Sequence, residues 1–347
     1  MVDWSIARSI AVRIAGDPGR PQLADDLAAL CADSERRVVA YTQLQPASAL
    51  PPPELIDRPA WLDANLANMR STLDPVVDRM SRPRARVPTA MNEAIKAAGG
   101  LVISAEVGGL VGLMAQRVLG QYDISPVDPE GPARLLFVAP NLRDAAARLE
   151  VDERSLLRWV ALHELTHAVQ FSSVPWLRGH IAGLTRELLE TIDVRLRIDL
   201  RTVRDAASPG ALRERFEQLR DDGLMTAVIG SDRRAVLDRV QATMALIEGH
   251  AEHVMDAAGV DALPDLDQLR SALDRRRRER SGAWRIVERL LGLEMKMRQY
   301  EVGKRFCDEV VAERGVTGLN RAWRGPELLP TWTELEQPRL WLARAAT

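Results

Sequence analysis

Cysteine, tyrosine and phenylalanine are scarce in this sequence of 347 residues, with 2, 3 and 4 occurrences. The cysteines, Cys31 and Cys307, form no CxxC pair and cannot build a disulfide framework. They are typical of buried apolar positions in a reducing compartment, so we expect a cytoplasmic protein. Because Leu, Ala, Arg and Glu are abundant while Phe and Tyr are rare, the composition favours helices over sheets.

An excess of charge of one sign is also missing. The formal net charge is −2, with 28% charged and 46% hydrophobic residues. This balance is that of an ordinary globular protein, and it gives no basic field that would attract nucleic acid. The sequence also contains no GxGxxG motif, no P-loop and no Ser-His-Asp signature.

No apolar run is long and uniform enough to predict a membrane span. The best candidate, Ala97–Ala115, carries Glu106 near its middle and is rich in glycine. We therefore predict a buried helix whose small residues let a neighbouring helix approach closely. The N-terminal segment is interrupted by charges, which predicts an amphipathic helix and not a signal peptide. Its apolar face is expected to carry Trp4, Ile6, Ile10 and Ile14.

Helical periodicity dominates the rest of the chain. We predict a single, mainly α-helical unit of residues 1–347 with a small β-sheet, divided into a helical N-terminal part (1–132) and a second part (133–347) that carries the motif described next. The proline-rich stretch Gln45–Ala60 and the stretch Gly120–Pro132 are predicted loops. RLLFVAPN (Arg134–Asn141) is the best strand candidate, and it is the expected exposed edge of the sheet.

The stretch LHELTHAVQF (Leu162–Phe171) holds two of the five histidines. His163 and His167 lie one helical turn apart, so their side chains point the same way and can bind one Zn²⁺. Glu164 can reach a metal-bound water without binding the metal itself. These are the parts of an HExxH site, two ligands and a general base, within an apolar helix that Asp152 is expected to cap. The competing interpretation is a pair of core histidines beside a surface glutamate.

A zinc site of this kind needs a third protein ligand. The metzincin continuation HExxHxxGxxH is absent, because Gln170 stands where its glycine would be. Thr243–Asp256 is a second helical stretch, and its EGHAE core places Glu248 and Glu252 one turn apart. We predict that Glu248 is the third ligand. Glu252 would hold His163 or His167 in the required tautomer.

Other candidates stay open around this stretch. His250 and His253 compete with Glu248 as the third ligand, or else suit an outer or substrate-facing position where a donor stabilises an oxyanion. Tyr300 could supply the same donor, although a packed aromatic side chain is the simpler interpretation. The run RRRRER (Arg275–Arg280) is flanked by acidic residues and indicates a solvated helix face.

The expected mechanism follows from these residues. Zn²⁺ lowers the pKa of its bound water toward ~7. Glu164 takes the proton as general base, the hydroxide attacks a polarised carbonyl, and Glu164 passes the proton to the leaving amine.

Several stretches carry a family resemblance, namely VLGQYD (Val118–Asp123), LLFVAPN (Leu135–Asn141), WVALHELTHAVQF (Trp159–Phe171), EGHAEHVMD (Glu248–Asp256), MRQYEVGKRF (Met297–Phe306) and LPTWTELEQPRLWLAR (Leu329–Arg344). Over most of its length the chain resembles an actinobacterial and chloroflexal family of zinc-dependent, zincin-like metallohydrolases. One branch of that family is labelled as associated with biosynthesis of the deazaflavin coenzyme. The resemblance implies a mostly helical zincin-like fold, with His163 and His167 as ligands and Glu164 as the catalytic residue. It implies no substrate.

The sequence therefore predicts a zinc metallopeptidase or amide hydrolase that acts on a peptide or a small amide. One alternative is a non-catalytic protein that uses the zincin scaffold to bind a partner, although such a protein has no need of Glu164. The other is a zinc hydrolase of a small metabolite. A long groove beside an exposed strand edge favours the peptide, and a closed pocket favours the small molecule.

Overall fold

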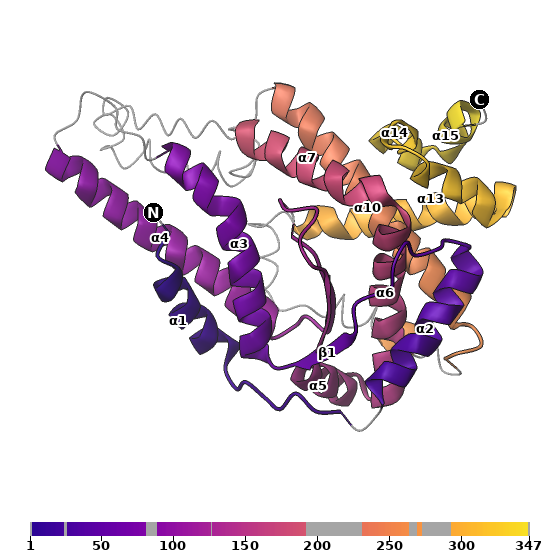
Figure 1. Cartoon of the computed structure of the whole chain (residues 1–347), viewed down its shortest axis with the longest axis horizontal. Coiled ribbons are helices and arrows are strands. Elements are labelled where there is room, and N and C mark those ends of the chain that lie inside the picture. Colours follow the sequence, from indigo (N-terminus) through magenta and orange to yellow (C-terminus); the bar gives the residue numbers. More distant parts are fainter. Residues whose placement is uncertain are drawn as a thin grey trace, which may run out of the picture.

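A computed structural model of the chain describes residues 2–23, 26–80, 89–125, 127–191, 231–263, 269–272 and 293–345. Within these residues the fold is mostly helical with one small sheet, as predicted (Figure 1). The elements are α1 (Trp4–Ala15), α2 (Leu27–Thr42), β1 (Pro53–Ile56), α3 (Arg58–Met80), α4 (Thr89–Ala115), β2 (Gly120–Asp123), β3 (Arg134–Val138), α5 (Ala139–Leu149), α6 (Glu153–Ser173), α7 (Pro175–Thr191), α10 (Ser231–Gly259), α13 (Leu293–Leu319), the 3₁₀ turns η1 (Asn320–Trp323) and η2 (Pro326–Leu328), α14 (Trp332–Glu336) and α15 (Pro338–Ala345).

The sheet has the strand order β1-β3-β2, with β1 parallel and β2 antiparallel to β3. The strand predicted from RLLFVAPN is confirmed as β3, but it is the central strand, so the expectation that it forms an edge is wrong. The two predicted loops are also wrong in part, because they contain β1 and β2. Each of these strands is only four residues long and begins with Pro53 or Gly120, so neither shows the alternation on which a strand prediction depends.

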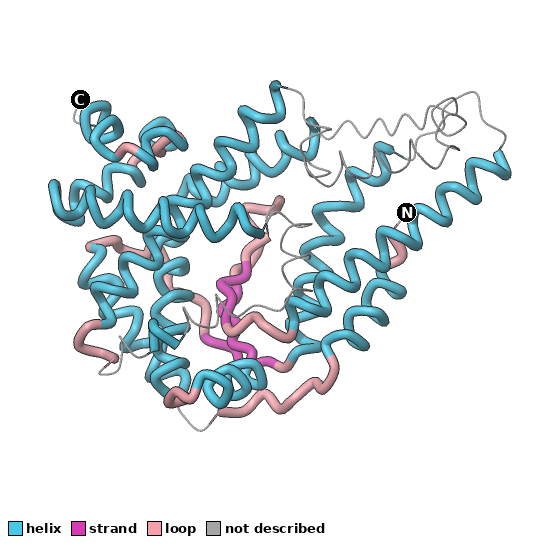
Figure 2. The backbone as a smooth tube through the Cα atoms, turned by 180° about the vertical axis from the view of Figure 1, so that it is seen from behind, coloured by secondary structure: helices cyan, strands magenta, loops and turns pink. Residues whose placement is uncertain are grey.

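Helices cover both faces of the sheet. Leu136 and Val138 pack with α1, α3 and α4, whereas Leu135 and Phe137 point to the opposite face and pack with α2, α5 and α6. This alternation is that of a strand buried on both faces. Figure 2 shows the strands between the two groups of helices. The expected division into residues 1–132 and 133–347 stays a prediction, and one sheet draws strands from both parts.

Small residues bring α1 and α4 close together, as predicted for the glycine-rich helix, but the helix is not buried throughout, because Leu101, Val102 and Ile103 are exposed. Ala7 and Ala11 are fully buried, and a Cβ atom on Gly112 would lie 2.7 Å from the Ala11 carbonyl oxygen. Alanines make the closest contact, which the sequence did not indicate. The four residues predicted for the apolar face are half-buried beside them, namely Trp4, Ile6, Ile10 and Ile14. No helix among the described residues is both long and apolar enough to cross a membrane.

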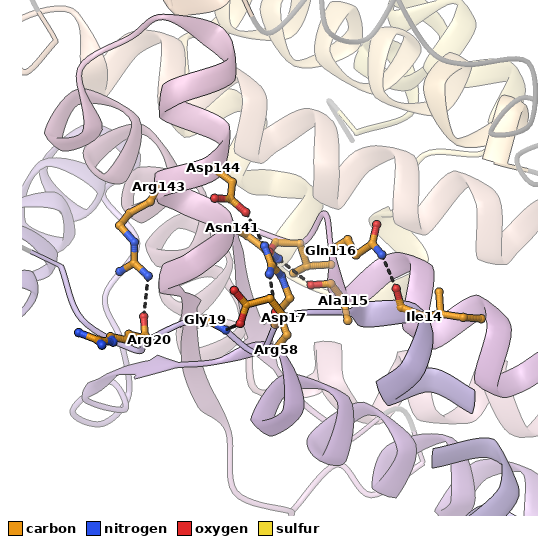
Figure 3. A network of polar contacts seen from close by, with 11 residues as sticks. Ile14, Asp17, Gly19, Arg20, Arg58, Ala115, Gln116, Asn141, Arg143 and Asp144 are labelled. Carbon is orange, nitrogen blue, oxygen red and sulfur yellow. Dashed lines mark hydrogen bonds and ion pairs between the residues drawn. The ribbon is translucent and has the colours of Figure 1, made fainter. Parts of the chain in front are cut away.

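A buried arginine joins four segments on the α5 side of the fold (Figure 3). Arg58, at the start of α3, donates from Nε to Asn141 Oδ1 at 2.8 Å and from Nη1 to the Asp17 carbonyl at 2.6 Å. Its Nη2 bonds Asp144 Oδ2 at 2.5 Å. Asn141 in turn donates to the Ala115 carbonyl at the end of α4. Because each nitrogen of the Arg58 guanidinium donates a hydrogen bond, these bonds compensate the cost of burying its charge.

The C-terminal tail packs onto α13. Thr331 and Glu334 form a capping box at the start of α14, and Trp341 is fully buried with its ring 5.3 Å from that of Phe306. Both cysteines are buried and free, which confirms their predicted apolar character. The run Arg275–Arg280 lies outside the described residues, so its predicted solvated face stays a prediction.

The α1–α4 contact predicts opposite effects of two neighbouring substitutions. A methyl group on Gly108 would lie 3.0 Å from Ala7 Cα and closer still to the Ala7 carbonyl oxygen. Gly108→Ala should therefore lower the free energy of unfolding by about 1–3 kcal/mol in urea denaturation. Gly109→Ala is the matched control, because its Cβ meets only Ile14 Cδ1 at 4.0 Å. It should stabilise the helix by about 0.5–1 kcal/mol. Equal effects would contradict this packing.

Candidate metal centre

The HELTH motif lies in the most deeply buried part of α6. Asp152 caps the helix as predicted, because its Oδ2 accepts the Ser155 backbone N–H at 2.8 Å. The helix then runs between two hydrophobic cores, one on each side. Leu162 and Val169 belong to the core with α10 and α13, while Leu165 belongs to the core with β3 and α5. Packing on both sides holds the helix, and with it the two histidines, in one orientation.

Glu248 lies on α10, which crosses α13 at a pair of glycines. A Cβ atom on Gly249 would overlap the Gly303 backbone, and one on Gly303 would overlap the Ala245 carbonyl. The two backbones are therefore in direct contact. Gly249 directly follows Glu248, and the helix that it lets approach closely is α13 and not α6. The crossing fixes where α10 presents Glu248.

The side chains of His163, His167 and Glu248 meet at one point. The two Nε2 atoms are 3.1 Å apart, and Glu248 Oε2 lies 3.6 Å from His167 Nε2 and 3.8 Å from His163 Nε2. A zinc ion with bonds of about 2.0–2.1 Å in tetrahedral geometry separates its ligand atoms by about 3.4 Å. The three distances therefore fit an ion between these atoms. Two imidazoles and one carboxylate also form a donor set known from catalytic zinc sites.

The donor atoms are partly buried and lie near carboxylate groups that make the local electrostatic potential negative. The His163 and Glu248 side chains are 20% exposed and that of His167 is 11% exposed, so solvent reaches the site. Burial lowers the pKa of His167, but the carboxylates of Glu248 and Glu164 outweigh it, and the pKa lies above its ordinary value. The surroundings thus favour positive charge at the point where the donors meet, which also favours a cation.

Glu164 is held between α6 and the edge strand β2. Its Oε2 accepts the Tyr122 backbone N–H at 2.7 Å. Gly120 leaves room for it, because a Cβ atom there would lie 2.7 Å from Val160 Cγ1 and 2.8 Å from Glu164 Cγ. Burial raises the pKa of Glu164, while His163, His167 and the Tyr122 N–H oppose the rise. A fixed, buried carboxyl group with a raised pKa beside the donor atoms suits a general base.

His253 lies in a separate polar network. Its Nε2 is 2.7 Å from the Tyr41 hydroxyl, and its Nδ1 is 2.7 Å from Asp308 Oδ1. Asp308 also accepts from Lys304 at 2.6 Å, and Lys304 lies 3.0 Å from Asp256. Both ring nitrogens of His253 are therefore engaged in joining α2, α10 and α13. The geometry gives no support to His253 as the third ligand.

The other histidine of α10, His250, is fully buried against Trp323, with 5.3 Å between the ring centroids. Burial, together with His253 and His167, lowers the pKa of His250 to about 3, so its imidazole is neutral. It does not belong to the group of three donors whose atoms lie within 4.8 Å of one another.

The supporting roles predicted for Glu252 and Tyr300 stay predictions. Glu252 is half-buried on α10, one turn after Glu248. The outer nitrogen of His163, Nδ1, lies 3.1 Å from the Met255 sulfur, a neighbour that the sequence did not indicate. Tyr300 lies within α13, but its side chain is outside the described residues.

The contact between Glu164 and β2 was not predicted from the sequence. A strand of four residues carries almost no periodic signal. One signal was present nevertheless, since the glycine of VLGQYD marks a point where another element can approach the backbone closely. Two further buried residues were also not predicted as parts of the site. Met255 contacts His163, and Gln170 follows His167 by three residues on α6.

The mostly helical fold and the cluster of two histidines and a glutamate place the chain in the class of zincin-like metallohydrolases. The sequence pattern of the zincin-like metallopeptidase family matches residues 2–342, and the chain belongs to that family. This confirms the predicted fold class over nearly the whole chain. The narrower actinobacterial and chloroflexal branch and its association with deazaflavin biosynthesis stay predictions.

A solved structure supports the same assignment. The chain is similar to a candidate hydrolase with a novel fold from Chloroflexus aurantiacus, with 29% sequence identity and a TM-score of 0.71. The similarity covers 100% of this chain and 99% of the other. None of the curated proteins compared with the chain is similar enough to count as a match.

The donor cluster predicts one divalent metal ion per chain. Glu248→Ala should sharply lower metal content, measured by elemental analysis of protein purified without added metal, because it removes one of three ligands. Glu252→Ala should lower it by less, in the range of about 10–100-fold in affinity that outer partners contribute. His253→Ala is the control for the competing ligand. A site emptied by His253→Ala but not by Glu248→Ala would overturn the ligand assignment.

The glycine crossing makes a second prediction. Gly303→Ala should push α13 away from α10, lower the free energy of unfolding by about 1–3 kcal/mol and weaken metal binding, because Glu248 moves with α10. Gly183→Ala on α7 is the matched control, since nothing lies within 4 Å of its Cβ position. Chelator competition measures the zinc affinity of both variants. Wild-type affinity in Gly303→Ala would show that the crossing does not position Glu248.

Proposed function

We propose that the protein is a zinc-dependent hydrolase of amide bonds, most simply a metallopeptidase, in which His163, His167 and Glu248 hold the ion. The observation that carries this proposal is the meeting of three ligand atoms from two helices within 4.8 Å of one another. The buried carboxyl group of Glu164 beside them supports hydrolysis in particular. When bound, zinc would lower the pKa of a water toward about 7 and polarise the substrate carbonyl.

Glu164 acts as the general base in this proposal. Its Oε2 is fixed by the Tyr122 N–H, which leaves Oε1 as the oxygen that can accept the proton of the attacking water. Glu164 then carries that proton to the leaving nitrogen. Because the strand holds this carboxyl group, its distance to the reacting atoms does not depend on a mobile side chain, and such positioning contributes to rate.

The edge of β2 supports a peptide as the substrate. Among the described strands, β2 pairs only with β3, so its other edge has no strand partner. Tyr122 points its N–H to that edge, where Glu164 receives it. Because Glu164 already accepts the Tyr122 N–H, an extended peptide beside β2 would run next to the proposed base and bond to other main-chain groups of the strand, a common mode of peptide recognition.

Glu164→Gln is the test of this function. The change keeps size and hydrogen bonding but removes the proton acceptor, so metal content and fold should stay as in the wild type. Hydrolysis of a peptide library should fall by at least the ~10²–10⁴-fold that a positioned acid–base group contributes. The control is Glu130→Gln, an exposed glutamate in the loop after β2, which should have wild-type activity.

The outcomes separate the competing functions. A scaffold that only binds partners would show no hydrolysis in either protein. A hydrolase of a small metabolite would leave the peptide library intact but cleave small amides in an E164Q-sensitive way. Equal rates for the wild type and E164Q would remove Glu164 from the mechanism, and a wild type that stays metal-free when zinc is supplied would overturn the proposal.

A further inference from the structure

Gln170 is a fully buried carboxamide that the proposed mechanism does not use. It lies in α6 among buried apolar neighbours, Ala168, Val169 and Phe171. Within the part of the chain that the structure describes, both of its side-chain polar atoms, Oε1 and Nε2, are buried without a hydrogen-bond partner. An amide in this position is unfavourable unless another group satisfies it, so its presence calls for a function.

His167, one helical turn earlier, has a ring nitrogen that requires a hydrogen-bond partner of the kind that Gln170 can supply. Residues three apart lie on the same side of a helix. The Nε2 of His167 faces His163 and Glu248, which leaves Nδ1 on the far side of the ring. Among the described residues, this Nδ1 is also buried without a hydrogen-bond partner, and Gln170 lies three residues further along the same side of α6.

We propose that Gln170 is the positioning residue for His167. Its Oε1 accepts the Nδ1–H, directly or through one ordered water, and fixes the tautomer in which the Nε2 lone pair faces the metal. This inference rests on the proposed metal site. A histidine that binds a metal commonly donates its other N–H to an acceptor that sets its tautomer and ring orientation. The sequence led us to expect Glu252 in this position.

Two further buried polar atoms on α10 and η1 could bind such a water. Among the described residues, His250 Nδ1 and Trp323 Nε1 are buried without a hydrogen-bond partner, and their ring centroids are 5.3 Å apart. A buried water needs two to four polar partners, and these atoms together with Gln170 could supply them.

A neutral partner has a chemical consequence. A carboxylate bonded to a ligating histidine makes the imidazole more basic, whereas a carboxamide fixes the ring without adding negative charge. Gln170 therefore holds His167 in place while leaving the metal with more of its positive charge. Zinc should bind less tightly than with a carboxylate partner.

The test compares zinc affinities of the wild type, Gln170→Leu and Gln170→Glu by chelator competition on the full chain. Gln170→Leu should weaken zinc binding by about 10–100-fold. The thermal stability of the metal-free protein should fall only slightly, because Q170L leaves the His167 Nδ1–H without its acceptor. A purely structural role predicts lower stability with an unchanged zinc affinity. Gln170→Glu should bind zinc at least as tightly as the wild type, and affinity no better than that of Q170L would overturn the proposal.

Thr166→Val is the matched control, because Thr166 is equally buried on α6 and its hydroxyl is satisfied by the Leu162 carbonyl at 2.6 Å. It should bind zinc as the wild type does. ¹⁵N NMR of the zinc-loaded protein should show His167 with its proton on Nδ1. Wild-type zinc affinity in Q170L overturns the inference, and weakened binding in Glu252→Gln beside wild-type affinity in Q170L would assign the position to Glu252. A wild type that binds no zinc would refute the proposed function instead.

Discussion

The arrangement of the site depends on one backbone contact, that of Gly249 on α10 with Gly303 on α13. Two helices in contact at glycines have little freedom to shift, because no side chain separates them. Glu248 directly precedes the contact, so its backbone position is fixed by it. On the other side, α6 is held between two hydrophobic cores. The three donor atoms meet only because both helices are fixed.

The parts of the site that the sequence predicted are those set by local geometry. His163, Glu164 and His167 lie on one helix, where spacing alone determines which side chains share a face. Glu248 and Glu252 were found in the same way, from a one-turn spacing of carboxylates on a second helix. The sequence could not show that the two helices meet, because that contact depends on packing between residues distant in the chain. That the two helices meet was inferred only because a zinc site with two histidines needs a third protein ligand.

The parts that escaped prediction depend on neighbours. β1 and β2 are extended because β3 lies between them, and four residues starting with Pro53 or Gly120 carry too little pattern of their own. Ala7 and Ala11 form the most deeply buried part of α1, because only small residues allow α4 to approach so closely. Gln170 looked like an interruption of a known motif, and only its burial beside His167 gives it a role.

The donor atoms come from two helices separated by a long stretch of chain, so an ion bound by all three would act as a cross-link. It would close a loop that includes α7 and tie α6 to α10. Opening of this loop would then require loss of the ion, and metal bound only to the folded chain shifts the folding equilibrium. Metal supply in the cell would thereby govern how long the folded protein survives proteolysis, in addition to how fast it turns over substrate.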